Sequence, residues 1–172
     1  MNSETRNTLS IPTFTARALE DRDAAPLQSL FDEDPEYFLG MNGRAIPVAE
    51  IRAALPPGRA REVKFVYVIE RGHRIAGMID LIRFYPEPTT WFLGFLFIAK
   101  AFRGAGLGRT TLHALYDHVR AQGGTALRLG VVEDNARARW LYASEGFTFN
   151  AMREVDPAVN RLRRTLVLER PL

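Results

Sequence analysis

The most constraining feature of the sequence is an apolar run that passes through a glycine-rich loop into an amphipathic helix. The run Thr90–Ile98 is almost entirely apolar, which is typical of a strand covered on both faces. Gly104, Gly106 and Gly108 follow in one loop, and the period over Leu112–Val119 is then helical. A buried strand that leads directly into a surface helix indicates an α/β domain.

The rest of the chain supplies further strands and helices around this unit. Alternating or β-branched runs predict strands, and apolar residues at helical spacing closed by glycine or proline predict helices. The strands are expected at Pro12–Leu19, Val63–Glu70, Arg74–Phe84, Thr90–Ile98, Ala126–Val132, Phe147–Arg153 and Arg163–Glu169. The helices are expected after an N-cap at Asp23 through Phe31, over Pro47–Leu55, around Leu112–Val119, and over Asn135–Glu145.

The composition limits the number of domains, the compartment and the chemistry. With 172 residues, 47% of them hydrophobic, the chain is long enough for one core. We therefore expect a flexible tail over residues 1–10 and a single domain over residues 11–172. The absence of cysteine excludes disulfides, thiolate metal sites and a cysteine nucleophile. Because no apolar run reaches about 18 residues and no signal peptide is visible, we expect a cytoplasmic protein without a membrane partner.

Arginine supplies most of the positive charge, with 21 of the 23 basic residues and a formal net charge of +3. Its fork geometry suits phosphate and carboxylate groups, so a phosphorylated ligand has to be considered. No dense basic block occurs, and the arginines alternate with acids. We therefore interpret them as a solvated surface and do not expect a nucleic-acid partner. The histidines, His73, His113 and His118, lack metal-ligand spacing, so no metal ion is expected.

The glycine-rich loop has the properties of an anion site. From Arg103 to Arg109 it reads Arg-Gly-Ala-Gly-Leu-Gly-Arg, between a predicted strand and a predicted helix. Glycines let the backbone approach a ligand, and the free N–H groups at a helix start attract negative charge. A tight turn with close helix packing would use the same glycines, but the setting favours phosphate binding. The loop matches neither the P-loop nor the dinucleotide fingerprint, because the chain has no Gly-Lys pair and the last glycine is wrongly spaced.

Two motifs together resemble the GCN5-related N-acetyltransferase (GNAT) family. The first, Arg103-Gly104-Ala105-Gly106-Leu107-Gly108, is similar to the family's acyl-CoA loop, [Q/R]-x-x-G-x-[G/A]. The second is similar to the family's N-x-x-A-x-x-[L/F]-Y-x-x-x-G-F helix, and its matching positions are Asn135, Ala138, Leu141, Tyr142, Gly146 and Phe147. The resemblance is detailed over Thr90–Phe147. It implies a GNAT-like α/β (α+β) fold, with a mixed, mostly antiparallel central sheet of about seven strands flanked by about four helices.

The resemblance also implies acetyl-CoA as cosubstrate, together with the residues that bind it. In the family, backbone N–H groups of the loop hold the CoA pyrophosphate, and the end of the preceding strand pairs with the pantetheine amides. The implied binding residues are Phe97, Ile98, Arg103, Gly104, Ala105, Gly106, Leu107, Gly108, Arg109, Asn135 and Tyr142. Asn135 also has the properties of a helix N-cap, and the two roles are compatible. A tyrosine placed like Tyr142 is also typical of helix packing.

The implied reaction is direct transfer of an acetyl group to an amine in a ternary complex, without a covalent enzyme intermediate. The N–H of Ile98 is expected to stabilise the oxyanion, and Tyr142 to protonate the departing thiolate. Many relatives carry a glutamate on the central strand, about four residues before Ile98. This chain has Gly94 there, and Trp91–Ile98 contains no ionisable side chain. The general base is therefore expected to be water or a carboxylate from outside this strand.

The candidates for that role are Glu33, Asp34 and Glu36, because in the family the loop after the first helix borders the acceptor side. A solvated acidic loop is the alternative interpretation. The acceptor is expected to be an amine on a small molecule or a protein. The sequence does not decide between these, and it leaves a homodimer open. The competing hypothesis is a non-catalytic acyl-CoA-binding or nucleic-acid-binding module on the same fold, because fold alone does not establish function.

Overall fold

The structure, a computed structural model, describes residues 8–42, 44–154 and 164–172. Its strands are β1 (Thr8–Ile11), β2 (Phe14–Ala18), β3 (Lys64–Arg71), β4 (Arg74–Ile82), β5 (Thr90–Ile98), β6 (Ala126–Val132), β7 (Thr148–Glu154) and β8 (Arg164–Pro171). They form one sheet in the order β1-β2-β3-β4-β5-β6-β8-β7. Neighbouring strands are antiparallel except for β5 and β6, which run parallel. The predicted mixed, mostly antiparallel sheet is thus confirmed.

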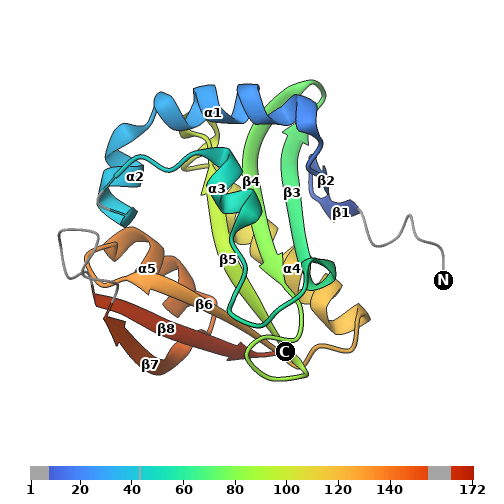
Figure 1. The fold of residues 1–172 in the computed structure, drawn as a ribbon, viewed down its shortest axis with the longest axis vertical. Helices are drawn as coiled ribbons and strands as arrows, with labels where there is room; N and C mark the ends of the chain where they lie inside the picture. Colours follow the sequence, from blue (N-terminus) through green and yellow to red (C-terminus); the bar gives the residue numbers. More distant parts are fainter. Residues whose placement is uncertain (1–7, 43, 155–163) are drawn as a thin grey trace.

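Helices cover both faces of this sheet. They are α1 (Ala24–Asp32), α2 (Pro35–Asn42), α3 (Val48–Ala53), α4 (Leu107–Ala121) and α5 (Ala136–Ser144). Helix α1 lies across one face over β4, and α4 packs on the opposite face against β1, β5 and β6 (Figure 1). Helix α5 lies beside the C-terminal strands. None of the helices in the described ranges is long and apolar enough to cross a membrane.

The N-terminal strand differs from the prediction. The expected single strand Pro12–Leu19 is a hairpin of β1 and β2, with Thr8 paired to Arg17 and Ile11 to Phe14. Residues 8–10 therefore belong to the sheet, so the predicted tail over residues 1–10 is too long; residues 1–7 lie outside the described residues. The physical reason is the alternation of β1, which buries Leu9 and Ile11 and exposes its polar residues. This hairpin brings the sheet to eight strands, one more than expected.

Helix α2 was not predicted from the sequence. With it, the described residues form five α-helices, one more than the four expected. Helix α2 begins at Pro35, where proline is tolerated because the first N–H of a helix has no intrahelical partner. Phe38 is buried, with its ring centroid 4.5 Å from that of Phe31 on α1 and 5.7 Å from that of Phe97 on β5. The segment is therefore held as a helix by tertiary packing of an aromatic side chain. The mixed acidic and aromatic composition of the segment has no clear helical period, so the sequence alone did not predict this packing.

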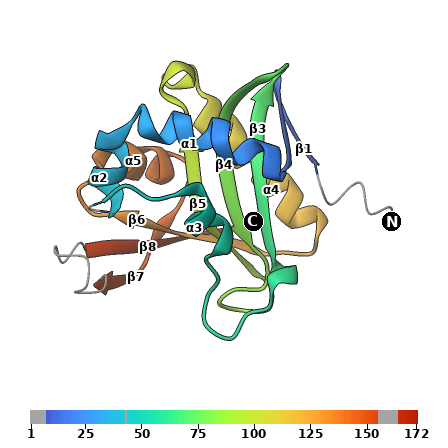
Figure 2. The same ribbon diagram turned by 45° about the horizontal axis from the view of Figure 1, so that its top comes forward.

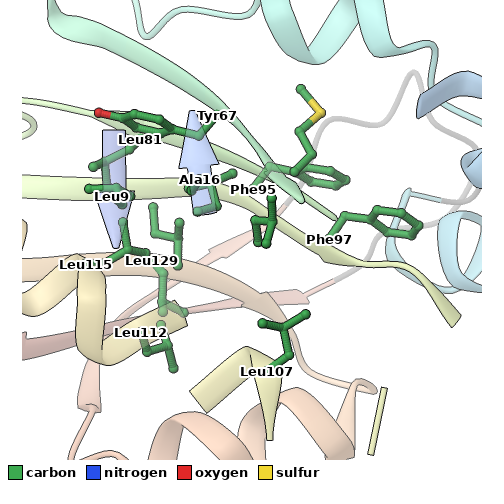
Figure 3. Packing of buried hydrophobic residues seen from close by; sticks show 14 of the residues in the cluster. Leu9, Ala16, Tyr67, Leu81, Phe95, Phe97, Leu107, Leu112, Leu115 and Leu129 are labelled. Carbon is green, nitrogen blue, oxygen red and sulfur yellow. The ribbon is translucent and has the colours of Figure 1, made fainter. Parts of the chain in front are cut away.

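The hydrophobic core lies on both sides of the central strands (Figure 3). On the α1 side, Phe95 and Phe97 are buried against the aromatic rings of α1 and α2. On the α4 side, Leu112 and Leu115 are fully buried and lie near Leu129 of β6. Strand β5 therefore contacts apolar groups on both faces, as its nearly continuous apolar run predicts.

Strands β5 and β6 separate halfway along their length. Their pairing extends only from Thr90 with Ala126 to Leu93 with Leu129. Beyond this point β5 continues beside β4, and β6 continues beside β8 (Figures 1 and 2). The last residues of β5 therefore have a sheet neighbour on one side only, and a gap opens beside them.

Candidate functional site

A cleft of about 730 Å³ lies at the gap between β5 and β6. This volume is in the range of small-molecule and cofactor sites, roughly 300–1,000 Å³. The cleft is lined by the end of β5, the glycine-rich loop, the start of α4, the end of β6 and one side of α5. Its lining includes most of the predicted site residues, namely Ile98, Arg103, Gly104, Gly106, Leu107, Gly108, Arg109, Asn135 and Tyr142.

The glycine-rich loop offers open space and free N–H groups to this cleft. Gly104 and Gly106 have φ angles of 86° and 83°, which glycine adopts without strain. A Cβ atom at either position would meet no atom within 4 Å. The first helical bond of α4 runs from the Thr110 N–H to the Gly106 carbonyl, so the N–H groups before Thr110 have no intrahelical partner. Such a cradle fits a diphosphate, because oriented N–H groups and the helix dipole both favour negative charge.

The two arginines of the loop are held by carboxylates of the protein. Arg103 donates from Nε to the Ile98 carbonyl at 2.7 Å, and its Nη2 pairs with Asp34. Arg109 pairs with Glu145 at 2.7 Å and donates to the Ser144 hydroxyl at 2.8 Å. Both side chains line the cleft, but their charges are partly compensated. The backbone N–H groups before Thr110 are therefore the donors of the loop that carboxylates of the protein do not compensate.

The end of β5 presents alternate residues to the gap. The Ala99 N–H donates to Ala76 on β4, so by antiparallel alternation the N–H groups of Leu96 and Ile98 face away from β4. The carbonyl groups of these two residues also face away from β4. The Leu96 carbonyl accepts a hydrogen bond from Tyr37 Oη at 3.0 Å, and the Ile98 carbonyl accepts one from Arg103. Ile98 therefore lines the cleft with its N–H group turned toward the gap. Phe97 does not line the cleft and is fully buried, and Leu96 stands in its place.

Helix α5 contributes the second motif. The Asn135 side chain accepts a hydrogen bond from the Ala138 N–H at 3.1 Å, which confirms its interpretation as an N-cap, and Asn135 also lines the cleft. Tyr142 lines the cleft one turn beyond Ala138, with its ring edge-to-face on Phe147 at 5.5 Å. Burial raises the pKa of Tyr142 to about 12. Its hydroxyl group is therefore protonated at neutral pH and available as a proton donor.

Several predicted residues are not brought to the cleft. Glu33 and Glu36 are exposed and do not line it. Asp34 is buried, but its carboxylate is paired with Arg103 and anchors the loop to the α1–α2 connection. Ala105 of the loop is exposed and is not part of the lining. The three acids therefore do not form a group that lines the cleft.

The structure adds lining residues that the sequence did not reveal. Tyr37 of α2 closes one side of the cleft. Arg44 and Glu50 line its mouth, and they are joined by two hydrogen bonds of 3.0 and 2.5 Å. Arg137 of α5 is exposed at its edge. Recognition of α2 would have indicated Tyr37, whereas the others follow only from how distant segments pack. No three His, Asp or Glu side chains in the described ranges are placed to hold a metal ion.

Comparisons with known proteins agree with this geometry. The sequence profile of the Acetyltransferase (GNAT) family matches residues 27–147, which include the end of β5, the glycine-rich loop and α5. No curated protein sequence matches the chain significantly.

Solved structures share the fold over nearly its whole length. An acetyltransferase from Thermus thermophilus has a TM-score of 0.72 and 22% identity, over 92% of this chain and 97% of that chain. The ribosomal-protein-S18-alanine N-acetyltransferase from Escherichia coli has a TM-score of 0.68 and 20% identity, over 92% and 93% of the two chains. The protein yncA from Salmonella typhimurium, solved with its cofactor acetyl-CoA, has a TM-score of 0.65 and 21% identity, over 93% and 94%.

The family profile covers well over half of the chain, and its matched range contains both motifs that meet at the cleft. The glycine-rich loop at the start of α4 and the Asn–Tyr face of α5 thus form one site on a fold shared with known acetyltransferases. From its sequence profile, its fold and this cleft, the chain belongs to the GNAT acetyltransferase family.

Proposed function

We propose that the protein transfers an acetyl group from acetyl-CoA to an amine by direct attack within a ternary complex. The observation that carries this proposal is the glycine-rich cradle at the start of α4, which opens into the cleft where β5 and β6 separate. Acetyl-CoA supplies an activated acetyl thioester when bound. The proposed cytoplasmic location suits this cosubstrate.

In this proposal, residues at the start of α4 bind the diphosphate, and residues at the end of β5 and on α5 act on the thioester. The N–H groups of Leu107, Gly108 and Arg109 hold the pyrophosphate. The N–H groups of Leu96 and Ile98 face the gap and are free to pair with an extended ligand in the manner of an added strand. The Ile98 N–H is the proposed oxyanion donor, and the protonated Tyr142 hydroxyl is the proposed acid for the leaving thiolate.

The acceptor is proposed to be an amine on a small molecule or a protein. One structural neighbour is named as an alanine N-acetyltransferase of a ribosomal protein, which adds protein N-termini to the acceptors worth testing. The mouth of the cleft on the α2–α3 side carries Arg44, Ile46 and Glu50. Paired charges beside an apolar residue suit an acceptor that has both polar and apolar parts.

The experiment is a thiol-release assay with acetyl-CoA across amines, polyamines, amino acids, aminoglycosides and peptides with free N-termini. Release that requires both the protein and one acceptor class, with an acetylated product seen by mass spectrometry, supports the proposal. Acetyl-CoA binding without transfer to any acceptor would favour the non-catalytic module. Co-sedimentation with DNA at physiological salt, without CoA binding, would favour the nucleic-acid alternative.

A further inference from the structure

A carboxylate from β4 occupies the space beside Gly94 on β5. A Cβ atom built on Gly94 would lie 2.8 Å from Asp80 Oδ2 and 3.3 Å from its Cγ. A side chain at position 94 would therefore displace the Asp80 carboxylate, which occupies that space. The register explains this approach, because Asp80 pairs with Phe95 and Leu81 with Leu93, which leaves Gly94 as the extra residue of a bulge.

The Asp80 carboxylate is buried and only half satisfied. Its relative exposure is 4%, and Lys64 Nζ on β3 donates to Oδ2 at 2.6 Å. The other oxygen, Oδ1, has no hydrogen-bond partner within the described part of the chain. Buried polar atoms are nearly always paired, so the unpaired Oδ1 can accept a further hydrogen bond from a ligand group. Asp80 does not itself line the cleft, but its carboxylate lies directly behind Gly94, which does. Neither Lys64 nor Asp80 has another role in the site described above.

We propose that Asp80 takes the place of the missing β5 carboxylate and accepts the proton of the acceptor amine, which reaches it through the gap that Gly94 leaves. This inference rests on the proposed acetyl transfer. The Asp80 carboxylate takes one proton from the ammonium group, and the freed nitrogen lone pair forms a C–N bond with the thioester carbonyl carbon. The C–S bond breaks as Tyr142 gives its proton to the thiolate, and the second proton of the nitrogen restores the Tyr142 hydroxyl. Asp80 then gives its proton to solvent. One proton is released to solvent per turnover.

The pKa of the Asp80 carboxyl lies above its ordinary value, and the surrounding groups act on it in opposite directions. Burial raises the pKa of the Asp80 carboxyl, whereas Lys64 and Arg61 lower it. Arg61 lies on the 3₁₀ turn Arg61–Val63 before β3. Helix α1, which packs on β4, carries one charged residue, Asp32, at its exposed end. Arg44 and Glu50 across the cleft are paired with each other.

The first test measures how fast the Asp80→Asn variant acetylates two different nucleophiles. The amine is the fastest acceptor of the thiol-release panel, and the second nucleophile is hydroxylamine, which is already uncharged near neutral pH and needs no base. We expect kcat/KM for the amine to fall about 10²–10⁴-fold, which is the usual contribution of a general base. Turnover of hydroxylamine and the affinity for acetyl-CoA should stay within a few-fold of the wild type. A purely structural role would lower both rates together.

Lys64→Met is the matched control, because it breaks the same buried ion pair but keeps the carboxylate. It should retain amine transfer on the alkaline side, with the acid limb of its pH profile moved to higher pH because Lys64 no longer lowers the pKa of Asp80. Asp80→Asn should lose that limb entirely. Its residual rate should rise about tenfold per pH unit as the free amine forms, up to the pKa of the amine itself.

A second variant keeps the test decisive if Asp80→Asn folds poorly. Asp80→Ala combined with Gly94→Glu removes the clash at position 94 and returns a carboxylate from β5, within reach of Lys64. Recovery of amine transfer to within about tenfold of the wild type is the expected result. The inference is overturned if the wild type transfers acetyl groups and Asp80→Asn does so at the same rate with the same pH profile. Absence of both acetyl-CoA binding and transfer in the wild type overturns the proposed function, and this inference with it.

Discussion

At the scale of single residues, the side chains that line the cleft combine structural and chemical roles. Asn135 caps α5 and faces the cleft at the same time, because an N-cap side chain lies at the open end of its helix. Arg103 ties the end of β5 to Asp34, so it orders the loop as well as lining the site. Tyr142 packs on Phe147 and still reaches the cleft. Substitutions must therefore separate stability from catalysis.

Tyr142→Phe separates them at the proposed acid. The ring contact with Phe147 is retained and only the hydroxyl is lost. We expect kcat to fall by up to about 10²–10⁴-fold, because the thiolate then leaves without a proton donor. The affinity for acetyl-CoA in a binding titration should stay nearly unchanged. Wild-type turnover at saturating substrate would assign Tyr142 to packing alone.

Asp23 makes a prediction about stability in acid. It stands at the N-cap position of α1 but makes no side-chain cap bond, contrary to the cap role expected from the sequence. Its carboxylate instead accepts two hydrogen bonds from Arg17, at 2.7 and 2.8 Å, and one from the Glu20 N–H at 2.8 Å. The Arg17 bonds, foremost, hold the pKa of Asp23 below its ordinary value of 3.8.

A lowered pKa in the folded state stabilises the fold above the ordinary value and loses this contribution as the pH falls through the lowered one. Asp23→Ala should therefore cost about 3 kcal/mol of unfolding free energy at neutral pH. The difference between variant and wild type should shrink below about pH 4. Urea titrations at a series of pH values measure both quantities. If the difference in unfolding free energy between Asp23→Ala and the wild type does not change with pH, the charge of the carboxylate is not the source of the stabilisation.

At the scale of elements, the start of α4 leaves its first N–H groups without intrahelical partners. Its N-cap, Gly106, makes no side-chain cap bond, so the first N–H groups are left for a ligand. Gly108 packs against α5, where an added Cβ would meet Leu141 at 3.5 Å, an ordinary contact. This position therefore accepts a side chain without distortion, which makes it suitable for testing the anion cradle.

Gly108→Asp places a carboxylate among the N–H groups of the first turn. A negative charge there favours the helix but repels the pyrophosphate, so the fold should persist while the affinity for acetyl-CoA falls at least tenfold. Gly108→Ala is the matched control and should gain up to about 1 kcal/mol of helix stability while still binding. Thermal-shift titrations with acetyl-CoA report both quantities. A saturating shift of wild-type size in the Asp variant would argue against the cradle.

At the scale of the whole molecule, the sheet works as two units that meet along a short parallel pairing. Strands β1 to β5 with α1 to α3 form one unit, and β6 to β8 with α5 form the other (Figures 1 and 2). The site lies where these units part, so its walls come from segments as distant in sequence as Tyr37 and Thr165. A ligand in the cleft therefore bridges the two units.

Hydrogen exchange should show this bridging. On addition of acetyl-CoA, we expect exchange to slow at Leu96, Ile98 and residues 107–109, whose N–H groups face the cleft. Ligand that binds only the folded state adds about 2.7 kcal/mol at a hundredfold excess over Kd, so slower exchange is also expected in the core amides that open by global unfolding. Amides of the β1–β2 hairpin that open locally should change little. Protection confined to that hairpin would place the ligand elsewhere.

Short-range patterns along the chain determined much of this protein. The apolar run of β5, the glycines before α4 and the Asn–Tyr spacing of α5 each specify their local structure, because neighbouring residues supply the necessary contacts. Most of the order of strands and helices along the chain therefore follows from the sequence, whereas the β1–β2 hairpin and α2 do not. Most residues of the cradle could be named in advance for the same reason.

Long-range contacts decided the rest. The burial of Phe38 stabilises a helix in an acidic segment, and the carboxylate of Asp34 is paired with Arg103. The bulge at Gly94 places the Asp80 carboxylate beside β5, and no local sequence pattern of β4 predicts this position. These features depend on which strands become neighbours and in which register. Register is a property of the folded sheet, so a carboxylate absent from one strand is supplied by the next only once the sheet has formed.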